Sequence, residues 1–238
     1  MSAKTSQTKI LIIDDHPILR SGITQVINQQ KDLIVCGEVG DASKALRAIE
    51  MTQCQLVILD ISLSGTSGIE ILKDIKVQHP KLPVLMLSMH DESVYAQRAL
   101  RAGASGYVMK HEATEKLILA IRKVLAGEVY LSEKLSAQLL QQIVGGTKSI
   151  TASPVEALSD RELEVFTLIG QGHGTRPIAE RLHLSVKTIE SHRAHIKEKL
   201  NLKTGVDLMH HAIQWVQSGN LGKGVAEGAV AEAAVPTV

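Results

Sequence analysis

Five short apolar runs, separated by segments of helical periodicity, constrain the fold of the first half of this 238-residue chain. Between the runs, apolar residues recur at helical spacing, as they do in segments 19–27 and 117–125. Strands that are apolar on both faces and alternate with helices are typical of a parallel sheet covered on both sides. Residues 8–128 are therefore predicted to form an α/β, doubly wound, flavodoxin-like (βα)5 domain. The runs lie at 10–13, 33–38, 55–59, 83–87 and 106–109.

Polar side chains directly follow four of these runs: Asp14 and Asp15 the first, Asp60 the third, Ser88 the fourth and Lys110 the fifth. The carboxyl ends of parallel strands meet at one edge of the sheet, so these side chains should converge. Three carboxylates in one pocket repel each other, and a hard divalent cation such as Mg²⁺ relieves that repulsion. A carboxylate beside Mg²⁺ can act as the nucleophile that forms an aspartyl phosphate, and Asp60 is best placed for this. The alternative is that each aspartate only caps the helix that follows it.

The second half of the chain has an all-helical pattern. A helix is expected over 132–144 and a flexible linker after it, so 129–156 is assigned as a linker helix and linker. In 157–218, Ser159 and Glu162 have capping-box spacing, Thr175 is predicted to cap a short helix, and Ser185 is predicted to cap a helix over 186–200. Two short helices joined by a tight turn indicate a helix-turn-helix, with its second helix suited to a DNA major groove. Residues 219–238 are rich in Gly, Ala and Val, and disorder is predicted there.

The overall charge of +1 means that any nucleic-acid surface must be local. Lys187, Arg193 and Lys197 lie on the predicted second helix, where they could contact phosphates; a solvated helix face is the alternative. No apolar run approaches the roughly 20 residues that span a bilayer, and the first residues lack a signal-peptide pattern. Cys36 and Cys54 are expected to be buried, reduced thiols. These features predict a cytoplasmic protein that has no membrane partner.

Residues 9–127 resemble a response-regulator receiver domain, through the motifs IIDDHP, VILD, LS and GYVMK in that order. The resemblance implies that Asp60 accepts a phosphoryl group from a sensor histidine kinase. It also implies a Mg²⁺ site formed by Asp15, Asp60 and the main-chain carbonyl of Ser62, with Asp14 acting through water.

The same resemblance implies that Ser88 and Lys110 hold the phosphoryl group, and that Tyr107 is the aromatic residue that turns inward when the site is phosphorylated. One position departs from the family pattern. Receivers of this kind usually have proline four residues after the acceptor aspartate, where this chain has Ser64. The departure predicts a looser loop but removes no reacting group.

Residues 158–217 resemble a LuxR-type helix-turn-helix domain, through LSDRELEV and IAERLHLSVKTIESHRAHIKEKL. The two resemblances together indicate a NarL/FixJ-type two-component response regulator. They imply that the first half of the second helix contacts bases, and that neighbouring side chains contact phosphates or nearby bases. The family pattern is broken at Arg176-Pro177 and at Gly205. The resemblance implies DNA contacts by Lys187, Thr188, Glu190, Ser191, Arg193 and Ala194. Lys197 is added to this set because it is a basic residue on the same helix.

The predicted function is a transcription regulator that binds double-stranded DNA and is switched by phosphorylation of Asp60. The expected cofactor is Mg²⁺, and the expected partners are a sensor histidine kinase, a second copy of the chain when phosphorylated, and RNA polymerase. Three alternatives remain: the same regulator controlled without phosphorylation, a phosphohydrolase, and a protein-binding adaptor. The phosphohydrolase is disfavoured because Ser62 stands where such enzymes carry a second carboxylate, and no enzymatic activity is therefore expected. An adaptor predicts no salt-dependent affinity for DNA.

Overall fold

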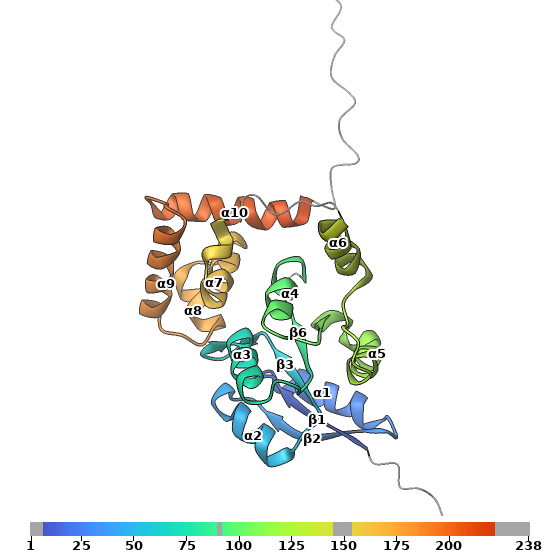
Figure 1. The fold of residues 1–238 in the computed structure, drawn as a ribbon. Helices are drawn as coiled ribbons and strands as arrows, with labels where there is room; N and C mark the ends of the chain where they lie inside the picture. Colours follow the sequence, from blue (N-terminus) through green and yellow to red (C-terminus); the bar gives the residue numbers. More distant parts are fainter. Residues whose placement is uncertain (1–6, 90–91, 145–153, 222–238) are drawn as a thin grey trace, which may run out of the picture.

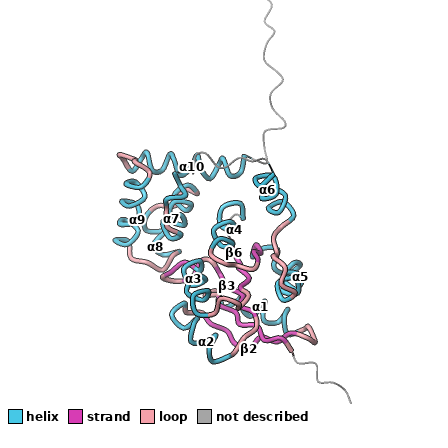
Figure 2. The backbone as a smooth tube through the Cα atoms, viewed as in Figure 1, coloured by secondary structure: helices cyan, strands magenta, loops and turns pink. Residues whose placement is uncertain are grey.

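The computed structural model describes residues 7–89, 92–144 and 154–221. Most of the predicted flexible linker lies outside the described residues. Of the predicted disordered tail, 219–238, the first three residues instead end the last described helix, and the rest lies outside the described residues. The first region is a parallel sheet flanked by helices, and the second contains helices and their connecting loops (Figures 1 and 2). Among the residues that the structure describes, none of the helices has the length and apolar character needed to cross a membrane.

The sheet has the strand order β2-β1-β3-β6-β7, with every neighbouring pair parallel. The predicted apolar runs thus form its strands, and β3 lies at its centre. A two-stranded hairpin that the sequence pattern did not predict follows β3 directly. The strands are β1 Thr8–Ile13, β2 Leu33–Val39, β3 Leu56–Asp60, β6 Val84–Ser88 and β7 Gly106–Met109, and the hairpin strands are β4 Ser62–Leu63 and β5 Thr66–Ser67.

Helices cover both faces of the sheet because its strands are apolar on both sides. Ile10, Ile12 and Ile58 pack on one face with α1 and α5, whereas Leu11 and Leu59 pack on the other with α2, α3 and α4. This arrangement confirms the predicted flavodoxin-like fold. The helices are α1 Pro17–Asn28, α2 Ala45–Thr52, α3 Gly68–Gln78, α4 Glu92–Arg101 and α5 Ala113–Leu125.

The second region begins with α6 Glu133–Val144, followed after the linker by α7 Asp160–Gly170, α8 Thr175–Arg181, α9 Val186–Lys199 and α10 Gly205–Leu221. Ser159 and Glu162 form the predicted capping box, and the Ser185 side chain caps α9. The predicted cap at Thr175 is wrong, because Gly174 is the N-cap and Thr175 is already the first residue of α8. The α8–turn–α9 unit is the predicted helix-turn-helix.

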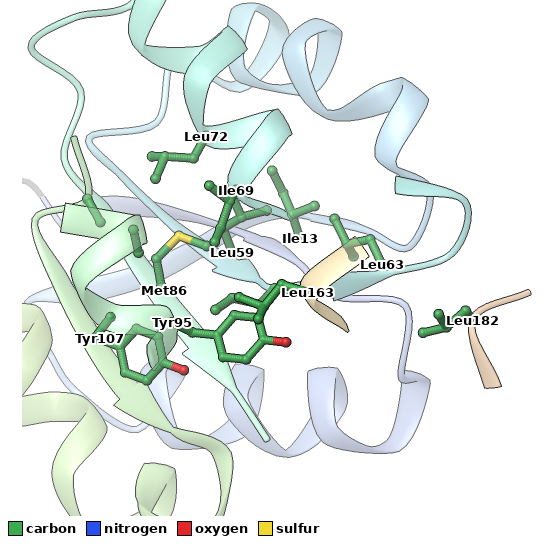
Figure 3. Packing of buried hydrophobic residues seen from close by; sticks show 14 of the residues in the cluster. Ile13, Leu59, Leu63, Ile69, Leu72, Met86, Tyr95, Tyr107, Leu163 and Leu182 are labelled. Atoms are coloured by element: carbon green, nitrogen blue, oxygen red, sulfur yellow. The ribbon is translucent and has the colours of Figure 1, made fainter. Parts of the chain in front are cut away.

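The two regions share a continuous apolar core, which runs through α7. Leu163 of α7 belongs to the same cluster of buried side chains as Met86 and Tyr95 of the sheet domain (Figure 3). On its other side α7 packs against α10, where the rings of Phe166 and Trp215 lie 5.6 Å apart. The helix is therefore buried between the sheet domain and the rest of its own domain.

Candidate functional site

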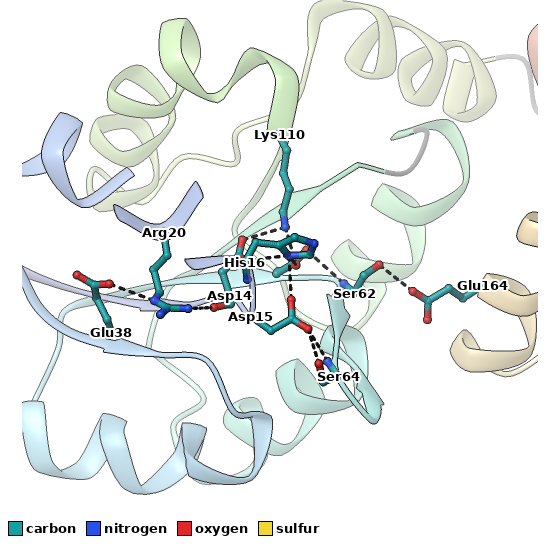
Figure 4. Close-up of polar contacts among 10 residues, drawn as sticks. Asp14, Asp15, His16, Arg20, Glu38, Ser62, Ser64, Lys110 and Glu164 are labelled. Atoms are coloured by element: carbon teal, nitrogen blue, oxygen red, sulfur yellow. Dashed lines mark hydrogen bonds and ion pairs between the residues drawn. The ribbon is translucent and has the colours of Figure 1, made fainter. Parts of the chain in front are cut away.

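Carboxylates gather at the carboxyl ends of β1 and β3, as the strand pattern predicts (Figure 4). Ligand atoms of Asp14, Asp15, His16 and Asp60 all lie within 4.8 Å of one another. Asp14 and Asp60 are almost fully buried, with exposed fractions of 0% and 1%. Burial of so many acidic groups in one place is unfavourable unless cations compensate them.

Lys110 provides the buried cation of this cluster. Its Nζ lies 2.6 Å from Oδ2 of Asp60 and 2.9 Å from Oδ2 of Asp14. One ammonium group thus serves two carboxylates. Burial raises the pKa of the Asp60 carboxyl, against the opposing effects of His16 and Lys110. The cluster therefore holds more negative charge than its own cations neutralise.

His16 lies at the open side of the cluster, and its side chain is 59% exposed. Its Nδ1 is 3.1 Å from Asp14 and 2.9 Å from Asp15. A hydrogen bond with Asp60 raises the pKa of His16 above its ordinary value, although burial opposes this. The sequence reasoning did not select His16, and the only available signal was its place directly after two aspartates.

The cluster has the donor atoms that a hard cation requires. Asp14 Oδ2 and Asp15 Oδ1 are buried and accept no hydrogen bond of good geometry within the described part of the chain, although the Lys110 ammonium lies near the first and His16 Nδ1 near the second. Buried carboxylate oxygens of this kind are the ligands that Mg²⁺ prefers. The residues present therefore fit a divalent cation.

Ser64 orients Asp15 within this cluster. Its backbone N–H and its hydroxyl both donate to Oδ2 of Asp15, at 2.9 and 2.6 Å. A proline at this position could donate neither bond. The departure from the family pattern thus adds two hydrogen bonds to a predicted metal ligand, and these bonds fix the loop that was expected to be looser.

Gly68 allows α3 to begin close to the end of β3. A Cβ atom at this position would overlap the carbonyl oxygen of Asp60. The Gly68 N–H instead donates to the carbonyl of Ile61, at 2.6 Å. The start of α3 is therefore packed directly against the main chain that carries Asp60.

The other two predicted phosphoryl-site positions also lie at this edge. Ser88 ends β6 and is fully buried. Tyr107 lies on β7 with 1% exposure, and its ring packs inward among apolar side chains near Tyr95 (Figure 3). The structure thus brings the predicted residues to one edge of the sheet, with Tyr107 in the buried position.

The second domain covers the acidic cluster. A cavity of about 80 Å³ is lined on one side by Asp15, His16, Asp60 and Lys110, and on the other by residues of α7 and of the α8–α9 turn. The hydroxyl of Ser62 donates to Oε1 of Glu164, at 2.7 Å (Figure 4). The covering residues are Glu164, Leu168, Arg181, Leu182 and His183.

These covering residues were not found from the sequence. Ser62 and Glu164 are 102 positions apart. Local periodicity and strand-end reasoning do not extend across such a distance. Only a pattern that described the contact between the two domains could have found Glu164.

A second set of polar contacts fastens the start of α7 to the sheet domain. Arg98 of α4 donates to the carbonyls of Leu158 and Val155, at 2.8 and 3.0 Å, and to Oδ1 of Asp160, at 3.1 Å. Lys73 of α3 donates to the other oxygen of Asp160, at 2.9 Å. The contact between the two domains is therefore specific, because cationic side chains of the sheet domain meet a carboxylate and carbonyl groups of the helical domain.

Helix α9 turns its polar face outward and its apolar face inward. Ile189 and Ile196 are buried in the core of the helical domain. Four of the predicted DNA-contacting side chains are exposed, namely Lys187, Glu190, Ser191 and Ala194, and three are half-buried, namely Thr188, Arg193 and Lys197. The residues predicted to contact bases are thus, as a set, more exposed than those predicted to contact phosphates.

Comparison with known proteins assigns each of the two regions to a protein family. Residues 10–122 match the response regulator receiver domain family, and residues 156–212 match the family of bacterial regulatory proteins of the luxR type. Oxygen regulatory protein NreC of Staphylococcus epidermidis is 37% identical over 211 residues, covering 87% of this chain and 97% of that protein.

Solved structures agree with this assignment. The response regulator RcsB of Salmonella typhimurium aligns with a TM-score of 0.61 at 26% identity, covering 88% of this chain and 98% of that one. RcsB of Salmonella enterica serovar Typhimurium, bound to promoter rprA in the presence of the phosphomimetic BeF3-, aligns with a TM-score of 0.57 at 26% identity, covering 87% and 99%. With a receiver domain, a helix-turn-helix domain and full-length relatives that share both, this chain belongs to the NarL/FixJ-type two-component response regulators.

Proposed function

We propose that the protein is a DNA-binding transcription regulator whose activity is switched by phosphorylation of Asp60 by a sensor histidine kinase in the cytoplasm. One observation carries the proposal. The cavity that contains Asp60 and Lys110 is covered by Glu164 and its neighbours from the DNA-binding domain. A charge added at Asp60 would therefore act directly on the contact between the two domains.

Asp14, Asp15, Asp60 and the Ser62 carbonyl would hold Mg²⁺, which when bound neutralises the cluster and polarises the phosphoryl donor. The Asp60 carboxylate is then the nucleophile that attacks phosphorus, and the leaving group departs on the opposite side. Lys110, already 2.6 Å from Asp60, and Ser88 are placed to hold the transferred oxygens. We propose Tyr107 as the switch aromatic, and its ring already lies inward in the docked arrangement.

Glu164 provides the physical basis for the switch. Its carboxylate is 1% exposed and faces the same small cavity, where it accepts the hydrogen bond from Ser62. Phosphorylation replaces the single negative charge of the Asp60 carboxylate with an acyl phosphate of about −2, a net addition of about one negative charge. Repulsion between this charge and Glu164 disfavours the docked arrangement and shifts the population toward separated domains.

Separated domains would leave α9, whose predicted base-contacting side chains are exposed even in the docked arrangement, free to enter a major groove as part of a two-fold dimer. We assign base contacts to Glu190, Ser191 and Ala194, and phosphate or nearby contacts to Lys187, Thr188, Arg193 and Lys197. Dimers of this type bind half-sites about one helical turn apart. RcsB, a structural relative, has been solved on promoter DNA with a phosphomimetic, which supports the same mode here. Contact with RNA polymerase would follow at the promoter.

The test compares wild type with Asp60→Asn, each with Mg²⁺ and with acetyl phosphate or beryllofluoride. Intact mass, oligomeric size and binding to promoter DNA are measured on the same samples. Wild type should gain mass with acetyl phosphate, form dimers and bind DNA more tightly, whereas Asp60→Asn should do none of these. Equal DNA binding by both proteins under all conditions would contradict the switch and favour a regulator controlled independently of phosphorylation.

A further inference from the structure

A basic groove lies between α3 and α4, beside the start of α7 and separate from the cavity at Asp60. Its volume is about 590 Å³. Four cationic side chains and one carboxylate line it, together with aliphatic side chains that include Ile69 and Val77. The charged lining residues are Lys73, Lys76, Arg98, Arg101 and Asp160.

The carboxylate in this groove comes from the DNA-binding domain. Asp160 is 7% exposed, and its two oxygens are bound separately, Oδ2 by Lys73 at 2.9 Å and Oδ1 by Arg98 at 3.1 Å. The groove is therefore already an anion-binding site, and in the docked arrangement its anion is part of the same chain.

Asp160 leaves most of the positive charge of the groove uncompensated. Arg101 is exposed and has no ion pair with any residue that the structure describes. Lys76 donates to the carbonyl of Leu82, at 2.6 Å, and forms no ion pair with a described carboxylate. Lys73 and Lys76, like Arg98 and Arg101, are three residues apart on a helix, which places each pair about 5–6 Å apart at Cβ. Two facing pairs of cations suit an elongated anion better than a single carboxylate.

We propose that this groove binds a small polyphosphate chain, which competes with Asp160 for Lys73 and Arg98. Phosphate oxygens accept charge-assisted hydrogen bonds from guanidinium and ammonium groups, and a chain of phosphates can reach both pairs. The groove has no aromatic side chain on which a base could stack. Recognition is therefore of the phosphate chain, whether that chain is free or belongs to a nucleoside triphosphate.

Ligand binding in this groove would shift the same equilibrium between docked and separated domains as phosphorylation, although the groove is separate from the cavity at Asp60. A ligand that takes Lys73 and Arg98 away from Asp160 binds the separated domains better than the docked ones, so it shifts the protein toward separation. By linkage, the factor by which the ligand favours separated over docked domains equals the factor by which separation strengthens ligand binding. The ligand would thus give the regulator a second input that does not require Asp60.

The test is isothermal titration of the full-length protein with sodium tripolyphosphate, in EDTA and at constant ionic strength. Wild type should bind saturably. Arg101→Gln, which does not touch Asp160, should weaken binding about fivefold, and Asp160→Asn should strengthen it because the competing carboxylate is lost. Arg47→Gln removes an equally exposed cation from α2 and is the matched control, with no change expected.

Further titrations distinguish the source of the chain and the independence of the site. ATP with affinity equal to tripolyphosphate would indicate recognition of the chain alone, and orthophosphate should bind at least tenfold more weakly. Wild type that has not met a phosphoryl donor should already bind tripolyphosphate, so this outcome does not depend on the phosphorylation switch. Three results would each overturn the proposal: absence of saturable binding to both wild type and Asp160→Asn, weaker binding by folded Asp160→Asn, or equal loss in Arg101→Gln and Arg47→Gln. Circular dichroism melting establishes that each variant is folded.

Discussion

Buried charges occur in two regions of the molecule, and the two regions balance them differently. At the sheet edge, the two buried carboxylates Asp14 and Asp60 share the ammonium of Lys110, and Asp15 lies beside them. Along α7, each buried carboxylate has a cation of its own: Asp160 has Lys73 and Arg98, Glu162 has Lys199, and Glu164 has Arg161.

The pKa shifts follow this difference. Burial raises the pKa of Asp60, whose surroundings do not compensate its charge. Burial acts in the same direction on Glu162, but hydrogen bonds from Lys199 and Ser159 outweigh it and lower the pKa of that group. The acidic cluster, whose charge is not fully compensated, favours binding of a cation. The compensated ion pairs along α7 instead stabilise the docked arrangement of the two domains.

The largest effect is expected from removing the shared cation. Lys110→Met would leave the buried carboxylates of Asp14 and Asp60 without their ammonium, and we expect the free energy of unfolding to fall by about 3–5 kcal/mol. Urea unfolding in EDTA measures this, and added Mg²⁺ should restore part of the loss. Lys116→Met, which breaks a partly exposed pair with Glu112, is the control and should cause only a small change. Similar losses in the two variants would contradict the difference between the regions.

Removing an anion from the compensated region should also destabilise the protein. Glu164→Gln weakens the 2.6 Å ion pair with Arg161 and the contact with Ser62. We expect a loss of about 2 kcal/mol, because the buried guanidinium of Arg161 loses its counter-charge. Unfolding followed through Trp215 fluorescence measures the loss, and the exposed Glu180→Gln on α8 is the matched control. Unchanged stability would show that the α7 charges do not hold the fold.

Removing an anion from the acidic cluster should instead raise the free energy of unfolding. Asp60→Asn leaves Lys110 paired with Asp14 and removes a buried charge whose raised pKa marks it as unfavourable. In EDTA we expect this variant to be about 1 kcal/mol more stable than wild type at neutral pH. Thermal and urea unfolding provide the measurement, and Mg²⁺ should stabilise wild type more than the variant. A destabilised Asp60→Asn would mean that the cluster is compensated after all.

The smallest effect concerns pH. Because the pKa of Glu162 is lowered on folding, its contribution to stability is present above the ordinary glutamate pKa and is lost as pH falls through the lowered value. Glu162→Gln should therefore lose about 0.5–1 kcal/mol at pH 7 and less at pH 3. The exposed Glu50→Gln on α2 is the control, with no expected difference at either pH. A deficit of the same size at both pH values would exclude the ion pair as its cause.

The sheet and its acidic edge could be predicted from the sequence because both depend on local patterns. Strands that are apolar on both faces can be recognised as continuous apolar runs in the sequence. Parallel strands must then bring Asp14 and Asp60 to one edge of the sheet. The cover formed by Glu164 could not be predicted, since it depends on how two separately patterned domains dock. Smaller errors had local causes: Cys36 lies on the edge strand β2 and is half-buried rather than buried, and α8 begins at Thr175 itself.

The close approach of Gly68 to the Asp60 carbonyl sets how freely this loop can vary. Substitution at Ser64 exchanges hydrogen bonds to Asp15 but leaves the main chain of the acceptor where it is. Any side chain at position 68 would instead displace the main chain at Asp60, although residue 68 has no reacting atom of its own. The tolerance of this loop to mutation is therefore asymmetric, permissive at Ser64 and restrictive at the first residue of α3.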